Sequence, residues 1–163
     1  MSSKKVIIIG GGPSGYVAAI RAAQLGAKVI LIEKDKIGGT CLNRGCIPTK
    51  ALLSDAKLLR SLKHSPVFQS LLHEGFDPLK SMMDRKKKVV QEIVKGVEML
   101  LESHRVTIKY GQANLLGINQ VVLINGIEKK EIIEADAIIL APGSRSKTFS
   151  SITPDGKKII TSD

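Results

Sequence analysis

The two cysteines of the chain, Cys41 and Cys46, are the residues whose type and spacing most clearly suggest chemistry. Two thiols cannot complete a four-ligand structural zinc site, so we expect no metal site. A chain from a reducing compartment seldom keeps a structural disulfide. The pair is therefore either two buried free thiols or a redox-active disulfide.

Geometry limits the second alternative. Residues five apart in a regular helix have Cα atoms roughly 8–9 Å apart, whereas a disulfide needs about 4.4–6.8 Å. A bridge would require an interrupted helix, which Gly45 and Pro48 would permit. A strained bridge at a helix end is readily reduced, and a helix N-terminus lowers the pKa of a nearby thiol. A bridge here would be catalytic rather than structural.

A glycine-rich loop lies near the start of the chain. Gly10, Gly12 and Gly15 satisfy the pattern G-x-G-x-x-G. The first glycine allows a tight turn, the second lets the backbone approach a pyrophosphate, and the third lets a helix pack on a strand. Pro13 and Ser14 would begin that helix, whose free N–H groups and dipole favour a phosphate.

Glu33 ends the next strand-like run of the sequence. A carboxylate there can accept hydrogen bonds from ribose hydroxyls, and its charge would repel a 2′-phosphate. Together with the glycines it predicts an adenine dinucleotide without that phosphate, which is FAD or NAD. The alternative interpretation of Glu33 is an ordinary solvated strand end.

These residues need a βαβ unit to position them. Lys5–Ile9 and Lys28–Glu33 are short β-branched runs typical of buried strands, and residues 13–25 between them form a helical pattern. Such a unit predicts a parallel sheet. The further elements that we expect are helices over 40–64 and 78–103, a short helix between them, strands over 106–110, 120–124, 127–133 and 158–161, a hairpin turn at 125–126, and a buried strand over 137–140. The two long helices would form an antiparallel excursion packed beside the sheet.

Composition narrows the class of protein. Hydrophobic residues make up 43% of the 163 residues, enough for a real core, and the net charge is +10. The densest basic run, residues 85–88, lies in a helical pattern without interleaved aromatic residues, which indicates a solvated helix face and no nucleic acid partner. No apolar run approaches the roughly 20 residues of a membrane span, and none resembles a secretory signal. We expect a cytoplasmic protein that is not bound to a membrane.

Residues 38–50, GGTCLNRGCIPTK, resemble the active-site segment of the class I flavoprotein disulfide reductases. The likeness is closest to the dihydrolipoamide dehydrogenases, in which Lys-Ala-Leu-Leu commonly follows, as it does at residues 50–53. Residues 12–26 also resemble the first helix of those enzymes. The resemblance covers essentially the whole chain and implies FAD, rather than NAD, at the glycine loop.

The resemblance also implies roles. Cys41 would be the interchange thiol, Cys46 the flavin-side thiol, and Lys50 would place positive charge beside the flavin. The other positions that it assigns to FAD are Gly10, Gly12, Pro13, Ser14, Gly15, Glu33, Lys34, Gly39, Thr40, Ala113, Ala141, Gly143 and Ser144. Where the family has threonine, this chain has Pro142, which removes a hydroxyl and a backbone N–H from that contact.

The implied fold is α/β: a Rossmann-like FAD-binding domain with a parallel sheet, a long helical excursion and a small antiparallel β-meander. Residues 1–145 would be the first segment of that domain, and 146–163 would begin a connection to a nicotinamide-binding domain. Members of the family are longer and carry that domain and a dimer-interface domain, so this chain is interpreted as truncated.

The implied activity is electron transfer from dihydrolipoamide, free or on a lipoyl domain, through Cys41–Cys46 and FAD to NAD, in a homodimer of the full-length enzyme. This chain alone would be inactive, because His64, His73 and His104 do not match the family's acid/base histidine and are expected to be exposed. The alternatives are a mercuric reductase, a glutathione reductase-like enzyme, a transhydrogenase, a simple NAD-dependent dehydrogenase domain or a non-catalytic dinucleotide-binding module.

Overall fold

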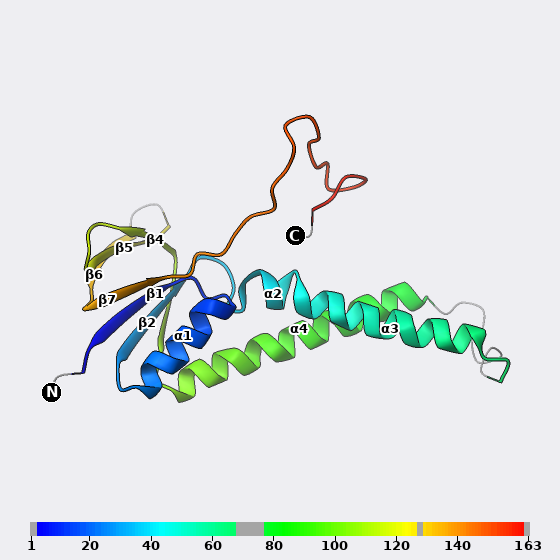
Figure 1. The fold of residues 1–163 in the computed structure, drawn as a ribbon, viewed down its shortest axis with the longest axis horizontal. Helices are drawn as coiled ribbons and strands as arrows, with labels where there is room; N and C mark the ends of the chain where they lie inside the picture. The colour runs from blue at the N-terminus through cyan, green and yellow to red at the C-terminus, as the bar shows by residue number, and fades with distance from the viewer. Residues whose placement is uncertain (1–2, 68–76, 127–128, 162–163) are drawn as a thin grey trace.

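The computed structural model describes residues 3–67, 77–126 and 129–161, and it forms an α/β structure from which a long helical hairpin extends (Figure 1). The elements in chain order are β1 (Lys5–Ile9), α1 (Pro13–Gln24), β2 (Lys28–Glu33), α2 (Gly39–Asn43), α3 (Cys46–His64), α4 (Pro78–Ser103), β3 (Thr107–Tyr110), β4 (Gln112–Leu115), β5 (Gln120–Asn125), β6 (Lys129–Glu134) and β7 (Ala137–Leu140).

The predicted βαβ unit is confirmed. β1 and β2 pair in parallel with Ile7 opposite Ile30, and α1 connects them. The main sheet has the order β3-β2-β1-β7, and each of its three strand pairs is parallel. The carboxyl ends of β1 and β2 therefore meet at one edge of the sheet, where ligands of open α/β sheets bind.

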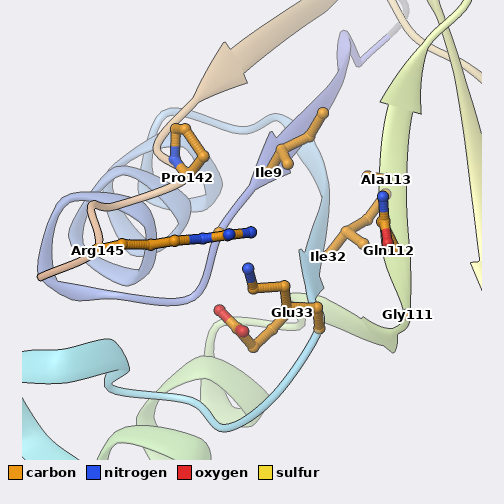
Figure 2. Close-up of a pocket in the computed structure, with 10 residues that line it drawn as sticks. Ile9, Ile32, Glu33, Gly111, Gln112, Ala113, Pro142 and Arg145 are labelled. Atoms are coloured by element: carbon orange, nitrogen blue, oxygen red, sulfur yellow. The ribbon is translucent and has the colours of Figure 1, made fainter. Parts of the chain in front are cut away.

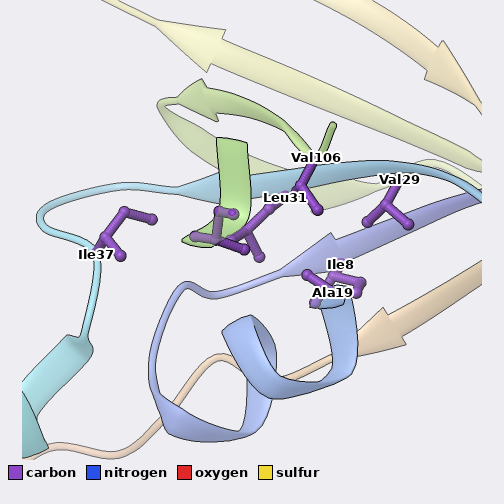
Figure 3. Close-up of a cluster of buried hydrophobic side chains, with 7 residues drawn as sticks. Ile8, Ala19, Val29, Leu31, Ile37 and Val106 are labelled. Atoms are coloured by element: carbon purple, nitrogen blue, oxygen red, sulfur yellow. The ribbon is translucent and has the colours of Figure 1, made fainter. Parts of the chain in front are cut away.

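The two faces of this sheet are covered differently. On one face Ile8 and Leu31 pack with Ala19 of α1 and Leu101 of α4 (Figure 3). On the other face Ile7 packs with buried residues of the small antiparallel sheet, whose strand order is β4-β5-β6. Because successive side chains of a strand point to opposite faces, the β-branched run of β1 supplies both cores.

The antiparallel sheet contains one strand that the sequence pattern did not indicate. β4 pairs with β5 and includes Ala113. The predicted antiparallel pairing of the next two strands, β5 and β6, is confirmed, but the predicted turn at 125–126 is wrong, because Asn125 belongs to β5 and pairs with Lys129. Residues 127–128, between these two strands, lie outside the described residues. β4 is short and half polar, so its extended conformation depends on its pairing with β5 rather than on its own composition.

The predicted packing of both long helices beside the sheet is wrong for most of their length. α3 and α4 run antiparallel and extend away from the sheet (Figure 1), and only the C-terminal end of α4 enters the core, where Leu101 is fully buried. Arg85 of α4 forms an ion pair of 2.9 Å with Asp55 of α3.

The predicted helix over 40–64 is two helices, α2 and α3. The predicted short helix between 65 and 78 lies largely outside the described residues.

Two expectations for the C-terminal part are also wrong. β7 is not a buried strand: Ile139 and Leu140 are exposed, because β7 pairs with β1 alone and lies at the edge of the sheet. Residues 158–161 do not form a strand. The carboxylate of Asp155 instead accepts backbone N–H groups of Lys157, Lys158 and Ile159 at 2.8–2.9 Å, which holds a turn.

Within the described residues, no helix combines the length and apolar character needed to cross a bilayer. The proposed boundary near residue 145 stays a prediction. From residue 141 the chain leaves the sheet and runs away from it (Figure 1).

Candidate functional site

The turn between β1 and α1 is built from contacts between backbones. Gly10 has φ +106°, and a Cβ there would lie 2.0 Å from the carbonyl oxygen of Ala141. A Cβ on Gly15 would lie 1.7 Å from the carbonyl oxygen of Gly10. The amide of Ala141 also donates to the carbonyl of Ile9 at 2.8 Å. Only glycine fits at positions 10 and 15, because any side chain would separate β1, α1 and the end of β7.

Gly12 differs from these two glycines. It is the N-cap residue of α1 in an extended conformation, and no side chain caps this helix end. A Cβ on Gly12 would find nothing closer than the Cα of Gly39 at 3.8 Å. The protein itself therefore does not require glycine here. A bare backbone next to uncapped N–H groups of a helix is the surface that a phosphate needs.

The loop before α2 lies against this surface. Gly39 has φ +55°, and a Cβ there would lie 2.8 Å from the Cα of Gly12. The amide of Gly38 donates to the carbonyl of Gly11 at 2.8 Å. Asn43 holds the loop in place through hydrogen bonds from Nδ2 to the carbonyls of Ile37 and Gly39, at 3.0 and 2.9 Å. The glycine turn of α1 and the segment that carries Cys41 are thus in direct contact.

Glu33 is not a solvated strand end, since only 8% of it is exposed. Its Oε2 accepts the backbone N–H of Gly11 at 2.6 Å, and its Oε1 accepts that of Asp35 at 2.8 Å. A carboxylate has about four acceptor positions, so two remain for ribose hydroxyls.

Sequence reasoning missed Gly11, where a Cβ would lie 2.8 Å from Ile37 and 3.2 Å from the Glu33 carboxylate. The run of three glycines was the available signal.

A pocket opens at the carboxyl ends of β1 and β2 (Figure 2). It brings together four of the predicted positions, Gly10, Glu33, Lys34 and Ala113. Pro142 lines it as well, so the position where the chain departs from the family pattern contributes an apolar wall. The lining residues that sequence reasoning missed are Ile9, Ile32, Gly111, Gln112 and Arg145.

The two cysteines lie on either side of a helix break. Cys41 belongs to α2, whereas Cys46 is the first residue of α3, and Gly45 between the helices has φ −122° and ψ −101°. Gly45 therefore interrupts the helix as predicted. Pro48 does not, because it lies in the first turn of α3, where a missing N–H costs nothing. Both cysteines are free thiols, with Cys41 half-buried and Cys46 exposed.

The thiols of Cys41 and Cys46 interact with each other. A hydrogen bond to the Cys46 side chain, reinforced by burial, raises the pKa of Cys41 above the usual 9.0. The positive charge of Lys50 acts in the opposite direction and is the weakest of the causes. The backbone N–H of Cys46, at the N-terminus of α3, does lower the pKa of Cys41 as expected. The hydrogen bond to the Cys46 side chain and burial outweigh it, so the pKa of Cys41 is raised on balance.

The remaining predicted residues lie outside the pocket. Pro13 and Ser14 open α1, and Thr40 is the second residue of α2. Gly143 and Ser144 follow β7 and are exposed. Among the described residues, no cluster of histidine, cysteine and acidic side chains could hold a metal ion.

The described histidines take no part in this arrangement. His64 is exposed at the end of α3. His104 is half-buried rather than exposed, and its Nδ1 lies 2.9 Å from the carbonyl oxygen of Leu100 at the end of α4. His73 lies outside the described residues.

Residues 4–162 match the model of the pyridine nucleotide-disulphide oxidoreductase family. The chain belongs to this family. Its members bind FAD, and the full-length enzymes also use NAD. The resemblance of residues 38–50 and 12–26 to the flavoprotein disulfide reductases is thereby confirmed.

Similar proteins agree with this assignment. The chain is 43% identical over 157 residues to the dihydrolipoyl dehydrogenase of Bacillus subtilis, covering 95% of this chain and 34% of the relative. It is 44% identical over 147 residues to that of Chlamydia trachomatis, covering 90% and 31%. The crystal structure of LpdA from Mycobacterium tuberculosis matches with a TM-score of 0.84 at 25% identity, covering 96% of this chain and 35% of that one. The chain spans about a third of the length of the curated relatives that it matches.

The hydrogen bonds of Glu33 predict a role in stability as well as in binding. In the ligand-free chain, Glu33→Ala should lower the free energy of unfolding by about 1–3 kcal/mol, because two backbone N–H groups lose their acceptor. Denaturant unfolding measures the change. Glu131→Ala is the control, since it removes a surface carboxylate paired with Lys109 and should cost less than about 1 kcal/mol. Equal stability of both variants would contradict the structural role of Glu33.

The contact between the thiols predicts how Cys41 titrates. Cys46→Ala removes the hydrogen bond that holds Cys41 neutral, so the pKa of Cys41 should fall and its alkylation near neutral pH should become faster. Lys50→Ala should act in the opposite direction, because it removes a positive charge that favours the thiolate. The rate of alkylation of Cys41 as a function of pH, with the site mapped by mass spectrometry, measures both. Identical pH profiles in all three proteins would show that the two thiols do not interact.

Proposed function

We propose that this chain holds the FAD and carries the redox-active cysteine pair of a dihydrolipoamide dehydrogenase-type oxidoreductase. The observation that carries the proposal is the meeting of Cys41 and Cys46 across the helix break at Gly45, next to the bare backbone of Gly12 and Gly39. Exchange of electrons between thiols and a flavin requires a dithiol close to the position that the flavin would occupy.

The residues present fit FAD. The space that the missing Cβ of Gly12 leaves open is not filled by protein, and the uncapped N-terminus of α1 faces it. Glu33 and Ala113 in the pocket would hold the adenosine, Gly12 and Gly39 the pyrophosphate, and Lys50 would lie beside the flavin ring. When bound, FAD supplies an acceptor for the electron pair of the dithiol.

The chain's own thiols would take these electrons by exchange. In the bridged state, a thiolate of dihydrolipoamide attacks Sγ of Cys41, the bond between the cysteines breaks, and Cys46 leaves as a thiolate. The second thiol of the substrate then breaks the mixed disulfide, which releases oxidised lipoamide and leaves both cysteines reduced. The attacked sulfur is assigned to Cys41 and the leaving thiolate to Cys46 because these are the roles that the family resemblance implies.

Three further features are proposed for the full-length enzyme: transfer of the electrons to NAD, an acid/base histidine and a homodimer. The relatives are about three times as long as the part that this chain matches. Residues 1–145 would form the first segment of the FAD domain, and 146–163 the start of the connection to a nicotinamide-binding domain. The segment after β7, including Ala141, Gly143 and Ser144, would touch the FAD. We propose dihydrolipoamide, free or on a lipoyl domain, as the substrate.

Gly12 provides the test of FAD binding. Gly12→Ala should lower the ligand-free stability by less than about 1 kcal/mol, the difference between glycine and alanine as an N-cap, because its backbone is extended and the nearest non-neighbouring atom to the new Cβ lies at 3.8 Å. The same Cβ should weaken FAD binding by at least about tenfold, a loss of about 1.4 kcal/mol, since it occupies the approach of the pyrophosphate. Fluorescence titration with FAD and denaturant unfolding measure the two quantities.

Gly15→Ala serves as the contrast, because its Cβ would overlap the carbonyl oxygen of Gly10 and destabilise the ligand-free fold. Equal FAD affinity of Gly12→Ala and the unchanged chain would contradict the proposed phosphate site.

The redox role is tested with the oxidised, FAD-loaded chain. Anaerobic addition of dihydrolipoamide should produce new thiols at Cys41 and Cys46, and Cys41→Ser should abolish this reaction because no bridge can form. Addition of NAD should yield no NADH, since we place the nicotinamide site in the remaining part of the full-length enzyme. Differential alkylation and absorbance measure thiols and NADH. Failure to form a bridge under oxidising conditions would contradict the redox role. Steady NADH formation would contradict the placement of the nicotinamide site outside this chain.

A further inference from the structure

Arg145 carries a cation into the pocket at the ends of β1 and β2 (Figure 2). Its side chain reaches into the pocket from the segment that follows β7, far in sequence from the glycine turn. In the described part of the chain, no ion pair includes Arg145, whereas Arg44 and Arg85 are paired with Asp35 and Asp55. The guanidinium of Arg145 is therefore available to a ligand of the pocket.

The neighbouring carboxylate does not explain this position. Both oxygens of Glu33 accept backbone N–H groups, from Gly11 and Asp35, and Glu33 forms no ion pair among the described residues. Arg145 is exposed apart from its contact with the pocket, so it does not support the fold either. Neither an ion pair nor packing within the protein therefore explains why the Arg145 side chain lies in the pocket.

The other walls of the pocket indicate the shape of the ligand. Ile9 of β1, Ile32 of β2, Ala113 of β4 and Pro142 after β7 contribute apolar lining from four different parts of the chain. An apolar wall combined with a planar cation suits a flat aromatic ring, because guanidinium groups stack on the faces of such rings while their N–H groups remain free to bond at the edge.

The position of Arg145 favours the adenine over the phosphates. The lining of this pocket includes Glu33 and Ala113 but not Pro13 or Ser14, which begin the helix that faces the proposed pyrophosphate position. We propose that Arg145 stacks on the adenine ring of FAD and closes the adenosine pocket on the side left open by the sheet. This inference rests on the proposed function, since it assumes that the chain binds the dinucleotide.

The test measures how strongly ADP and inorganic pyrophosphate compete with FAD for binding, in the parent chain and in its variants. Arg145→Ala should weaken ADP binding by about two- to thirtyfold, the range of a cation–π contact, and leave pyrophosphate binding unchanged. Arg145→Tyr should restore most of the ADP affinity, because it returns a flat face without a charge. Lys147→Ala is the matched control: it removes the same charge two residues away, at a position that does not line the pocket.

The outcomes separate this inference from the proposed function. Unchanged ADP affinity in Arg145→Ala, while the parent chain binds ADP and FAD, overturns the stacking role and leaves the FAD site standing. An equal loss for ADP and pyrophosphate, rescued by Arg145→Lys but not by Arg145→Tyr, overturns it in favour of a phosphate contact. A parent chain that binds neither ADP nor FAD overturns both proposals.

Discussion

The close approach of the Gly10 and Ala141 backbones is the constraint on which the rest of this structure depends. At this point the end of β1, the start of α1 and the end of β7 meet with no room for a single Cβ, at Gly10 or at Gly15. The contact aims α1 so that its uncapped N-terminus faces the edge where β1 and β2 end. It also directs the segment after β7 past the pocket, which gives Pro142 and Arg145 their places in its lining. The site is therefore a consequence of how three backbones pack.

Sequence reasoning predicted the elements whose signal is local. The β-branched runs of β1 and β2 and the intervening glycines define the βαβ unit without reference to the rest of the chain. It failed where tertiary pairing decides. Gln112–Leu115 is too short and polar to indicate a strand, yet it becomes β4 by pairing with β5. Residues 137–140 are apolar enough for a central strand, but β7 is an edge strand, because composition does not reveal which neighbours a strand will have.

The candidate site shows the same division. The glycine pattern and Glu33 could be picked out because their chemistry is tied to spacing along the chain. The hydrogen bond from Gly11 to Glu33 depends on how the loop turns back on the strand end, which spacing does not show. Gln112 and Arg145 reach the pocket from distant segments and carry no motif of their own. For the cysteines, the break at Gly45 was readable, whereas the raised pKa of Cys41 required knowledge of its neighbour.

The outer edge of β7 has a consequence for how the sheet can be extended. In the described part of the chain no strand pairs with that edge, and Ile139 and Leu140 expose apolar side chains beside it. Open edges of this kind are templates for strand addition. An incoming strand, whether from polypeptide joined to this chain or from another molecule, would gain a ladder of backbone hydrogen bonds without displacing β1 or β2. The open edge of β7 and the pocket are thus joined by one short segment of chain, since Pro142 and Arg145 of the pocket lining follow directly after β7.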